Sequence, residues 1–478
     1  MTTQRLQFTE WLPDQPAMAG SLNDAKNVVP LSLGYSGFPN AENYSGSASE
    51  NLNNIIVGKF GADVQVFAGG STKLFKMDNT TLALADVSKT GGYSSTDNWQ
   101  FKQFGKKILA ANNSAKIQSW EIASSIAFAD VNVSAPIAKY ITVVRDFVVA
   151  GHLNGGTDAN KVQWSDINDE TNWTSGSTSQ SDYQIIPDGG NITGLAGGEF
   201  GLVFLEKAVV RMSYIGSPLF FQFDTISRGL GCLEGNSIAT YGATTFFLAD
   251  DGFYKCDGTN VQGIGTEKVD RWFFGDCSLT DLDSMTTAID PVKKLVVWNY
   301  KAVDGKRHMI VYNWQISKWS RVETLATGVG TIASTGTTLE GLTSTLGYTS
   351  IDAMTASLDS RLWIGGKFLF AGFEDDKIIT FTGSTYNSEI ITTDVEVGYN
   401  SLVTLARPTI DNGGATVKVA SRKELDDTIG FSASVTTSSE GRAPLRSHGR
   451  YHRFSISPTG NWTNAVGVDV DITPAGTR

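Results

Sequence analysis

The sequence repeats one unit along most of its length, and this repetition constrains the fold more than any other feature. Each copy contains a short apolar segment, a tight polar turn, a second segment rich in aromatic residues and often a turn with Gly, Asp or Asn. Most neighbouring copies begin about forty to fifty residues apart, a spacing typical of propeller blades and solenoid repeats. The copies begin at Val64, Phe101, Ile141, Ile192, Ile238, Thr287 and Arg361.

Within each copy the residue pattern favours strands over helices. Val, Ile, Phe, Tyr and Thr are concentrated between glycines, and side chains alternate with period two in segments such as Val210–Tyr214. The turns contain Asp-Gly pairs at 251–252, 257–258 and 304–305, and these residue types tolerate the positive φ that tight hairpins require. Gly accounts for 50 of the 478 residues, above the usual ~7%, as expected of a chain with many turns.

The repeat predicts an all-β protein whose main domain is a β-propeller. A single four-stranded sheet cannot bury both of its faces, whereas radial stacking of such sheets buries them, with about 40–45 residues in each blade. We expect about six or seven blades. A plain sandwich or an up-and-down barrel is the structural alternative, and the repeat spacing argues against it.

Changes in the pattern along the chain suggest its domain organisation. Residues 1–50 contain four prolines and little periodicity, so we expect an irregular arm, either donated to a neighbour or lying on the domain as ordered coil. Residues 51–382 are expected to form the propeller, with a long excursion rich in Thr, Gly and Ser at 321–360. Residues 383–478 contain unrelated alternating strands and predict an appended, antiparallel β-sandwich-like domain.

Composition excludes several classes of protein. The net charge of −11 rules out a DNA-gripping basic surface over the whole chain. The three cysteines are too few, and odd in number, for a disulfide framework. Residues 1–20 have no apolar core, and no segment approaches the ~18 apolar residues of a membrane-spanning helix. We therefore expect synthesis in a reducing cytoplasm, without a signal peptide or a membrane anchor.

The sequence offers few residues for catalysis or metal binding. It contains only four histidines and lacks the HExxH, GxSxG, Walker and CxxC motifs. In a strand, His448 and His452 would share one face about 13 Å apart, too far to bind the same metal ion. We therefore predict no catalytic residues, no metal ion and no cofactor.

Paired carboxylates need separate consideration, because some propellers are glycosidases that use two of them. Asp250–Asp251 and Asp375–Asp376 occupy the same place in the repeat, at a turn between strands. This recurrence favours a role in the turn, with the side chains capping backbone N–H groups, over acid–base catalysis.

The segment Trp164–Trp173 resembles the aspartate-box turns of sialidase-type propellers. It occurs once and lacks their Ser-x-Asp-x-Gly-x-x-Trp spacing. Asp166, Asn168 and Glu170 could contact a cation, but no glycine or bidentate acidic residue follows at the positions of a calcium loop. We interpret the segment as a calcium-free structural loop anchored by its two tryptophans.

The densest basic cluster lies in the C-terminal part, within Gly441–Phe454. Two readings carry equal weight. The cluster could contact an acidic partner subunit or nucleic acid, or it could be a solvated edge that discourages pairing between sheets. Its members are Arg442, Arg446, Arg450 and Arg453, together with His448 and His452.

Several segments together resemble the tail proteins of short-tailed bacteriophages, and in organisation the chain is most similar to the tail nozzle or tail hub. The resemblance covers nearly the whole chain, although no single motif in it is diagnostic. The segments are Leu12–Asn40, the repeat units through Val162–Trp173, Thr225–Gly258, Ser357–Gly366 and Glu440–Phe454.

The resemblance implies a structural virion protein without enzyme activity. Such a protein forms a six-fold homo-oligomeric ring that closes the portal–adaptor channel, retains the packaged DNA and conducts it during ejection. The implied partners are the portal and adaptor proteins, tail fibres, spikes or needle proteins, and genome DNA passing through the lumen without specific binding. The implied location is the phage tail, assembled in the cytoplasm of the bacterial host.

The acidic composition fits this function, because a net-negative channel wall repels the phosphate backbone and lets DNA slide. Two alternatives from other classes remain. One is a carbohydrate-binding or depolymerising propeller of a phage adsorption apparatus, which needs a groove lined with Trp and paired carboxylates. Most of the 11 tryptophans lie in the strand repeats and are expected in the core. The other is a cellular interaction propeller, for which we expect a more regular signature in each blade.

Overall fold

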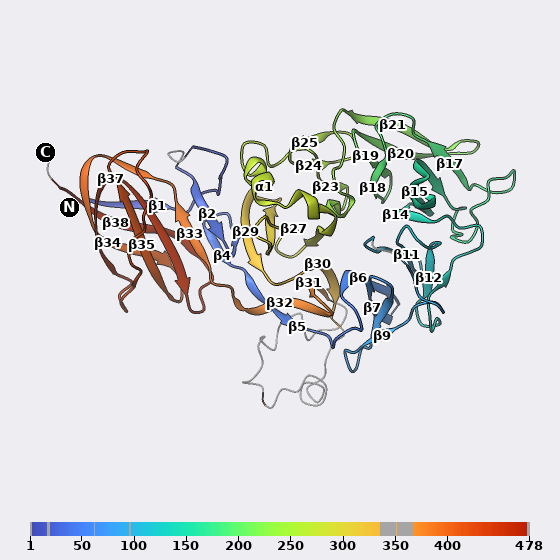
Figure 1. The fold of residues 1–478 in the computed structure, drawn as a ribbon, viewed down its shortest axis with the longest axis horizontal. Coiled ribbons are helices and arrows are strands. Elements are labelled where there is room, and N and C mark those ends of the chain that lie inside the picture. Colours follow the sequence, from blue (N-terminus) through green and yellow to red (C-terminus); the bar gives the residue numbers. More distant parts are fainter. Residues whose placement is uncertain are drawn as a thin grey trace.

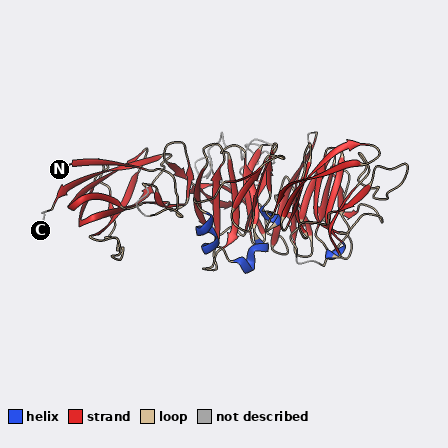
Figure 2. Ribbon diagram, turned by 90° about the horizontal axis from the view of Figure 1, so that it is seen from above, coloured by secondary structure: helices blue, strands red, loops and turns tan. Residues whose placement is uncertain are grey.

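The computed structural model describes residues 2–475, apart from 17–19, 62, 95–96, 335–349 and 351–366. Nearly all regular structure in the described part is β-strand (Figures 1 and 2). No helix in this part is long and apolar enough to span a membrane. The helices among the described residues are α1 (Asp270–Asp276) and three short 3-10 helices, η1 (Asn154–Gly156), η2 (Gly235–Ser237) and η3 (Leu279–Ser284).

Three four-stranded antiparallel sheets form the first blades, in each of which consecutive strands pair in chain order. The predicted alternation is visible in β14, where buried and half-buried residues alternate at both ends of the strand. The strands are β6 (Leu52–Phe60), β7 (Asp63–Gly70), β8 (Leu74–Met77) and β9 (Leu84–Asp86); β10 (Gln100–Phe104), β11 (Lys107–Ala111), β12 (Gln118–Glu121) and β13 (Ala129–Asp130); and β14 (Ala138–Val144), β15 (Phe147–Leu153), β16 (Asp158–Trp164) and β17 (Asp182–Ile185).

The next three blades continue the same pattern. The Asp-Gly turns adopt the positive φ expected of them, with φ of 89° at Gly258 and 83° at Gly305. The strands are β18 (Ile192–Ala196), β19 (Gly201–Leu205), β20 (Ala208–Gly216) and β21 (Phe220–Arg228); β22 (Ala239–Tyr241), β23 (Thr244–Leu248), β24 (Phe253–Cys256) and β25 (Val261–Gly263); and β26 (Thr286–Asp290), β27 (Leu295–Lys301), β28 (Arg307–Asn313) and β29 (Lys318–Thr324).

The last blade is closed by a strand from the N-terminal end of the chain. It contains β30 (Gly328–Ala333), β31 (Phe368–Glu374) and β32 (Lys377–Thr385), and its fourth strand is β5 (Pro39–Asn43), which pairs antiparallel with β32. Residues far apart in sequence thereby join the two ends of the propeller. Because β5 directly precedes the first blade in the chain, its pairing with β32 links the last blade to the first and closes the propeller.

The blades form a closed ring (Figure 1). The inner strand β6 contacts both β10 and β30, and β26 contacts both β22 and β30. Aromatic pairs fill the space between blades: Phe204–Phe247 joins β19 to β23 with ring centroids 4.9 Å apart, and Phe253–Trp298 joins β24 to β27 at 4.7 Å. The propeller prediction is therefore confirmed, with six separate four-stranded sheets and a seventh unit, β26–β29, that continues into a larger sheet.

The N-terminal residues differ from the irregular arm that the sequence suggested. They form five short strands in separate parts of the molecule, and β1 and β5 pair with β38 and β32. Strands β3 and β4 pair with each other as a local hairpin. The partners of β1, β2 and β5 lie hundreds of residues away, so no local hairpin pattern marks these three in the sequence. Besides β5, the strands are β1 (Thr2–Gln7), β2 (Leu22–Lys26), β3 (Val28–Pro30) and β4 (Tyr35–Gly37).

The expected excursion at 321–360 also needs correction where the structure describes it. Residues 321–324 complete β29, and 328–333 form β30, the inner strand of the last blade. Residues 335–349 and 351–360 of this range, together with all of Ser357–Gly366 and the beginning of the repeat copy at Arg361, lie outside the described residues.

The C-terminal strands lie beside the propeller, and both chain ends lie on their far side (Figure 2). They continue one hydrogen-bonded sheet of 14 strands that includes β26–β29. Their inward-facing side chains, such as Val417, Phe454 and Val470, are fully or almost fully buried in a common core. The strands are β33 (Glu389–Thr392), β34 (Val395–Ile410), β35 (Gly414–Arg422), β36 (Val435–Thr436), β37 (Ala443–Thr459) and β38 (Ala465–Pro474).

Candidate interaction surface on the C-terminal domain

The basic cluster lies on and just before β37, and strand alternation divides its members between two faces. Leu445 and Gly449 are buried, whereas Arg446, His448 and Arg450 are exposed because successive side chains point to opposite faces of a strand. Arg442, just before the strand, is exposed as well. We call Arg442, Arg446, His448 and Arg450 the arginine face.

The charges of the arginine face are only partly neutralised within the chain. Arg450 Nε donates to Glu396 Oε1 at 3.0 Å, and this hydrogen bond raises the pKa of Arg450. Arg442 lies 3.3 Å from Glu440 in an exposed ion pair, which contributes little in water. Arg446 forms no hydrogen bond or ion pair with any described residue. Its guanidinium is therefore available to an acidic group on another chain.

Arg453 is separated from the arginine face. It is 8% exposed, and it donates to both carboxylate oxygens of Asp394 at 3.1 and 3.0 Å. Arg422 forms a second ion pair with the same carboxylate. Two guanidinium groups thus offset the cost of burying one carboxylate. We correct the prediction for Arg453: it stabilises the domain and is not placed to contact a partner.

His448 and His452 lie in different environments, because His448 is exposed whereas His452 is fully buried. Glu396 pairs with Tyr451 and Ser401 pairs with Gly449, so residues 397–400 of β34 bulge opposite a single residue of β37. Beyond the bulge, Ser401 of β34 lies beside the His452 ring of β37.

His452 is fully buried between two serine hydroxyls. Its Nε2 lies 2.7 Å from Ser401 Oγ, and its Nδ1 lies 2.7 Å from Ser421 Oγ. Ser447 in turn donates to Ser421 at 2.7 Å. Burial disfavours the charged ring and lowers the pKa of His452 to about 4. The His452 ring is therefore uncharged at physiological pH, and its hydrogen bonds with the serines have a structural role.

The two aspartate pairs occupy equivalent turns, as expected. Asp250–Asp251 lies between β23 and β24, and Asp375–Asp376 lies between β31 and β32, which are the second and third strands of their blades. The expected capping of backbone N–H groups by these carboxylates is not seen. Asp250 instead forms an ion pair with Lys207, and Asp251 accepts a hydrogen bond from the Tyr254 hydroxyl at 2.8 Å.

The Trp164–Trp173 loop is anchored by its tryptophans. Trp164 Nε1 donates to the Gln180 carbonyl at 2.8 Å, and Trp173 Nε1 donates to the Glu170 carbonyl at 2.7 Å. Asp166 accepts the backbone N–H groups of Ile167 and Gln180, each at 2.9 Å, and these bonds lower the pKa of its carboxyl group. The Asp166 carboxylate is therefore directed into the loop, whereas the Glu170 carboxylate forms an ion pair with Lys107 on β11.

The described part of the chain offers neither a cluster of metal ligands nor an exposed cysteine. Within it, no group of three or more His, Cys, Asp or Glu side chains is placed to hold a metal ion. The three cysteines are free and buried, and burial raises the pKa of Cys232 and Cys277 to about 12. Thiols with so high a pKa are poor nucleophiles.

Sequence analysis missed the acidic partners of the arginines. Asp394 lies just before β34 and Glu396 lies on it, and both meet β37 only because these two strands pair in the sheet. The one available signal was the alternation in Thr393–Val397, which marks a strand with acidic residues on one face.

Comparisons with known proteins identify no family for this chain. No family model matches the sequence, and no curated protein matches it. Among solved structures, a "putative 6-phosphogluconolactonase" from Bacteroides fragilis is 15% identical over 56% of this chain and 81% of its own, with a TM-score of 0.36. A chain of the mitotic checkpoint complex is 9% identical, covering 75% of this chain and 99% of that chain, at 0.39.

A third similar structure is the Pan2 WD40 domain of Neurospora crassa. It is 10% identical over 70% of this chain and 92% of its own, with a TM-score of 0.37. At these values the similarities carry no argument about function. The class of the protein is defined by its own strand pairing: a β-propeller joined to a β-rich C-terminal domain.

Proposed function

We propose that this chain is a structural protein of a phage tail, the nozzle or hub at the distal end. Six copies form a ring that closes the portal–adaptor channel, retains the packaged DNA and conducts it during ejection. The ring contacts the portal and adaptor proteins above and tail fibres, spikes or needle proteins around it. The proposal begins with the sequence resemblance described above, and the geometry of the chain supports it.

The main support for the proposal is the strand pairing that connects the propeller with the C-terminal domain. Strand β2 pairs with β29 of the propeller and with β33 of the C-terminal domain. Arg321 on β29 donates to both carboxylate oxygens of Asp24 on β2, each at 2.7 Å, a bidentate geometry that is strong and directional. A ring that holds pressurised DNA needs such a continuous, stiff subunit.

A second contact fastens the N-terminal segment to the propeller. Asp14 accepts the first N–H groups of α1, from Arg271 at 2.9 Å and from Trp272 at 2.8 Å. The Trp11 ring packs edge-on against Trp272 with centroids 4.9 Å apart. The N-terminal segment, residues 2–43, therefore connects the two domains, and we call it the strap. Such a connection is consistent with a subunit that resists mechanical force.

The arginine face is the surface that we assign to contact with a neighbouring subunit or a docked fibre. The chain as a whole carries a net charge of −11, so an exposed basic surface on one subunit has acidic surfaces available on the next. Heterologous contacts of this kind close into a ring when the rotation between subunits fits. We expect the lumen wall to remain acidic or neutral, because a basic lining would bind DNA and stall it.

We propose no hydrolase activity for the chain. The alternative, a depolymerising propeller, needs two carboxylates facing one groove, whereas Asp250 and Asp251 are engaged by Lys207 and Tyr254 in a turn. Purified protein should therefore release no reducing sugar from host surface polysaccharide. Release that is lost in Asp250→Asn would overturn this part of the proposal.

Charge reversal at Arg446 tests the assigned contact. Arg446→Glu breaks no bond within the described chain, so the monomer should fold normally while incorporation into particles falls at least several-fold. The control is Arg228→Glu on the exposed end of β21, which should assemble like the wild type. Copies per particle are measured by quantitative mass spectrometry of purified virions. Normal incorporation of Arg446→Glu would contradict the assignment.

A further inference from the structure

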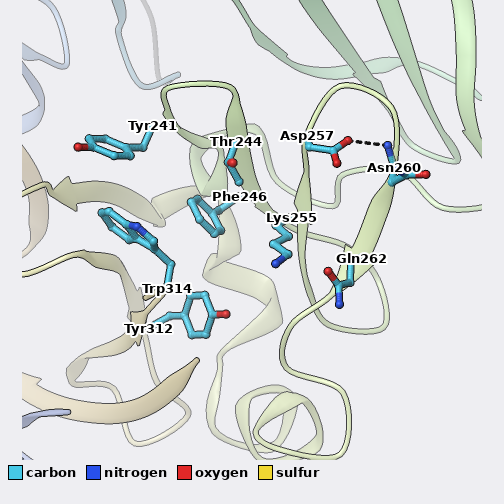
Figure 3. Close-up of a pocket in the computed structure, with 9 residues that line it drawn as sticks. All are labelled: Tyr241, Thr244, Phe246, Lys255, Asp257, Asn260, Gln262, Tyr312 and Trp314. Atoms are coloured by element: carbon cyan, nitrogen blue, oxygen red, sulfur yellow. Dashed lines mark hydrogen bonds between the residues drawn. The ribbon is translucent and has the colours of Figure 1, made fainter. Parts of the chain in front are cut away.

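A pocket opens between the blade β22–β25 and the neighbouring strand β28 (Figure 3). Its volume is about 340 Å³, at the lower end of the range for small-molecule sites. It lies on the propeller, and neither the arginine face nor the strap contributes to it. The proposed ring function therefore leaves it unexplained.

The register of the blade places polar and aromatic side chains on the wall of this pocket. Phe246 pairs with Lys255, and Lys255 pairs with Gln262, so these three form one row across β23, β24 and β25. Directly paired residues project from the same face of a sheet. Thr244, two residues before Phe246, lies on that face as well. The blade thus presents an apolar ring beside an ammonium, an amide and a hydroxyl group.

The opposite wall is aromatic. Tyr312 on β28 and Trp314 just after it face Phe246 and Tyr241 (Figure 3). The Tyr241 and Trp314 rings have centroids 5.1 Å apart at 39°, and those of Phe246 and Trp314 are 6.0 Å apart at 34°. Phe246 and Tyr312 are only 2% exposed, whereas Tyr241 is 41% exposed. Buried rings therefore form the floor, and Tyr241 stands at the mouth.

The polar groups of the pocket have unused bonding capacity. The side chains of Thr244, Lys255 and Gln262 hydrogen-bond to none of the described residues. Asp257 Oδ1 accepts three hydrogen bonds from its own turn, from the Thr259 and Asn260 backbone N–H groups and from the Thr259 hydroxyl. These turn bonds lower the pKa of Asp257 to about 2, so the carboxylate is ionised at neutral pH.

We propose that this pocket binds a pyranose saccharide unit. A pyranose ring has an apolar C–H face and a rim of hydroxyl groups, and the pocket offers an aromatic surface on one side and donors and acceptors on the other. Electron-rich aromatic faces attract the weakly positive C–H groups of such a ring. Lys255 and Asp257 carry opposite charges, so the pocket has no net preference for a charged ligand.

The same features argue against a nucleobase as the occupant. Single-stranded nucleic acid is bound by stacking combined with a basic groove that follows the backbone. Here the lining contains one lysine and one aspartate, inside a chain of net charge −11. A single copy of the chain can bind a saccharide without assembling into the proposed six-fold ring. The saccharide proposal is therefore tested independently of the proposed tail function.

The test is saturation-transfer NMR on the full chain with glucose, galactose, mannose and N-acetylglucosamine as probes. The variant is Tyr241→Ala, and the matched control is Tyr183→Ala, which removes another exposed tyrosine. Both tyrosines make a cation–π contact, which makes the control a matched one. Lys294 Nζ lies 5.4 Å from the centre of the Tyr241 ring, and Lys161 Nζ lies 4.1 Å from that of Tyr183. A second variant, Gln262→Leu, removes hydrogen bonding while keeping the size of the side chain.

We expect at least one sugar to show transfer to its ring protons. The signal should fall at least five-fold in Tyr241→Ala and in Gln262→Leu, and it should be unchanged in Tyr183→Ala. The absence of transfer to all four sugars would overturn the proposal, as would a signal that survives in Tyr241→Ala. Transfer to a hexathymidine oligonucleotide that is lost in Tyr241→Ala, with none to any sugar, would also overturn it and assign the pocket to nucleic acid.

Discussion

The buried carboxylate Asp394 shows how the local environment decides what a charged residue does. It lies between Arg422 and Arg453, while Glu396, two residues further along the chain, pairs with the exposed Arg450. Asp394→Asn should lower the free energy of unfolding by about 3–5 kcal/mol, because it leaves two buried guanidinium groups without their counter-charge. Glu396→Gln should change it by less than about 1 kcal/mol.

Urea denaturation at pH 7 measures both variants. Equal losses of stability in the two would contradict the different roles assigned to Asp394 and Glu396.

His452 should make stability depend on pH. Its pKa is about 4 in the folded chain and about 6.5 when solvated, so the unfolded state binds the proton more readily. The contribution is fully present above about pH 6.5 and is lost as pH falls from there through 4, by about 2 kcal/mol at pH 5.

Urea denaturation of the wild type and of His452→Gln at pH 7 and pH 5 checks this prediction. The loss of stability between the two pH values should be smaller in the variant by about 2 kcal/mol. Identical losses would show that His452 is not buried as a neutral ring.

Sequence analysis could place the residues of β37 only in part. Period-two alternation correctly groups Arg446 and Arg450 on one exposed face. It cannot show that Arg453 is buried, because that depends on Asp394 and Arg422 from other strands. Nor can it anticipate that His452 is buried between Ser401 and Ser421 of the neighbouring strands. Long-range pairing decides these positions.

At the scale of elements, the N-terminal strap should be as important to folding as a blade. Trp11 is fully buried, and its Nε1 donates to the Asn23 carbonyl at 3.2 Å. Trp11→Ala should lower the free energy of unfolding by about 3–5 kcal/mol through the cavity it creates. Leu33→Ala, in the same segment but 69% exposed, should change it by less than about 0.5 kcal/mol.

Denaturant unfolding of both variants provides the measurement. If Trp11→Ala were as stable as Leu33→Ala, the N-terminal segment would be a loose arm after all.

The strands that could be predicted from the sequence pair with strands close by in the chain, whereas those that could not be predicted pair with distant ones. The blades were predictable because each hairpin pairs with its immediate neighbour, so turn residues and alternation lie next to each other in the sequence. The strands β1, β2 and β5 were missed because their partners are β38, β33 and β32.

At the scale of the whole molecule, the account joins a closed propeller, a continuous sheet and an exposed basic face into one subunit of a ring. The aromatic pocket was also beyond sequence analysis. Tyr241 and Trp314 are far apart in sequence, and only the packing of adjacent blades brings them together. The general expectation that the tryptophans are mostly core residues is confirmed. Those that are buried are Trp11, Trp99, Trp120, Trp164, Trp173, Trp298, Trp319 and Trp462.

The six-fold ring is the central claim, and electron cryo-microscopy of purified phage particles tests it most directly. The account predicts a six-fold ring at the distal end of the tail into which six copies of this propeller fit. Arg446 should lie at a boundary with a neighbouring subunit or a fibre, facing away from the bore. A single copy in each particle, a location away from the tail, or a channel lined by Arg446 and Arg450 would contradict the account.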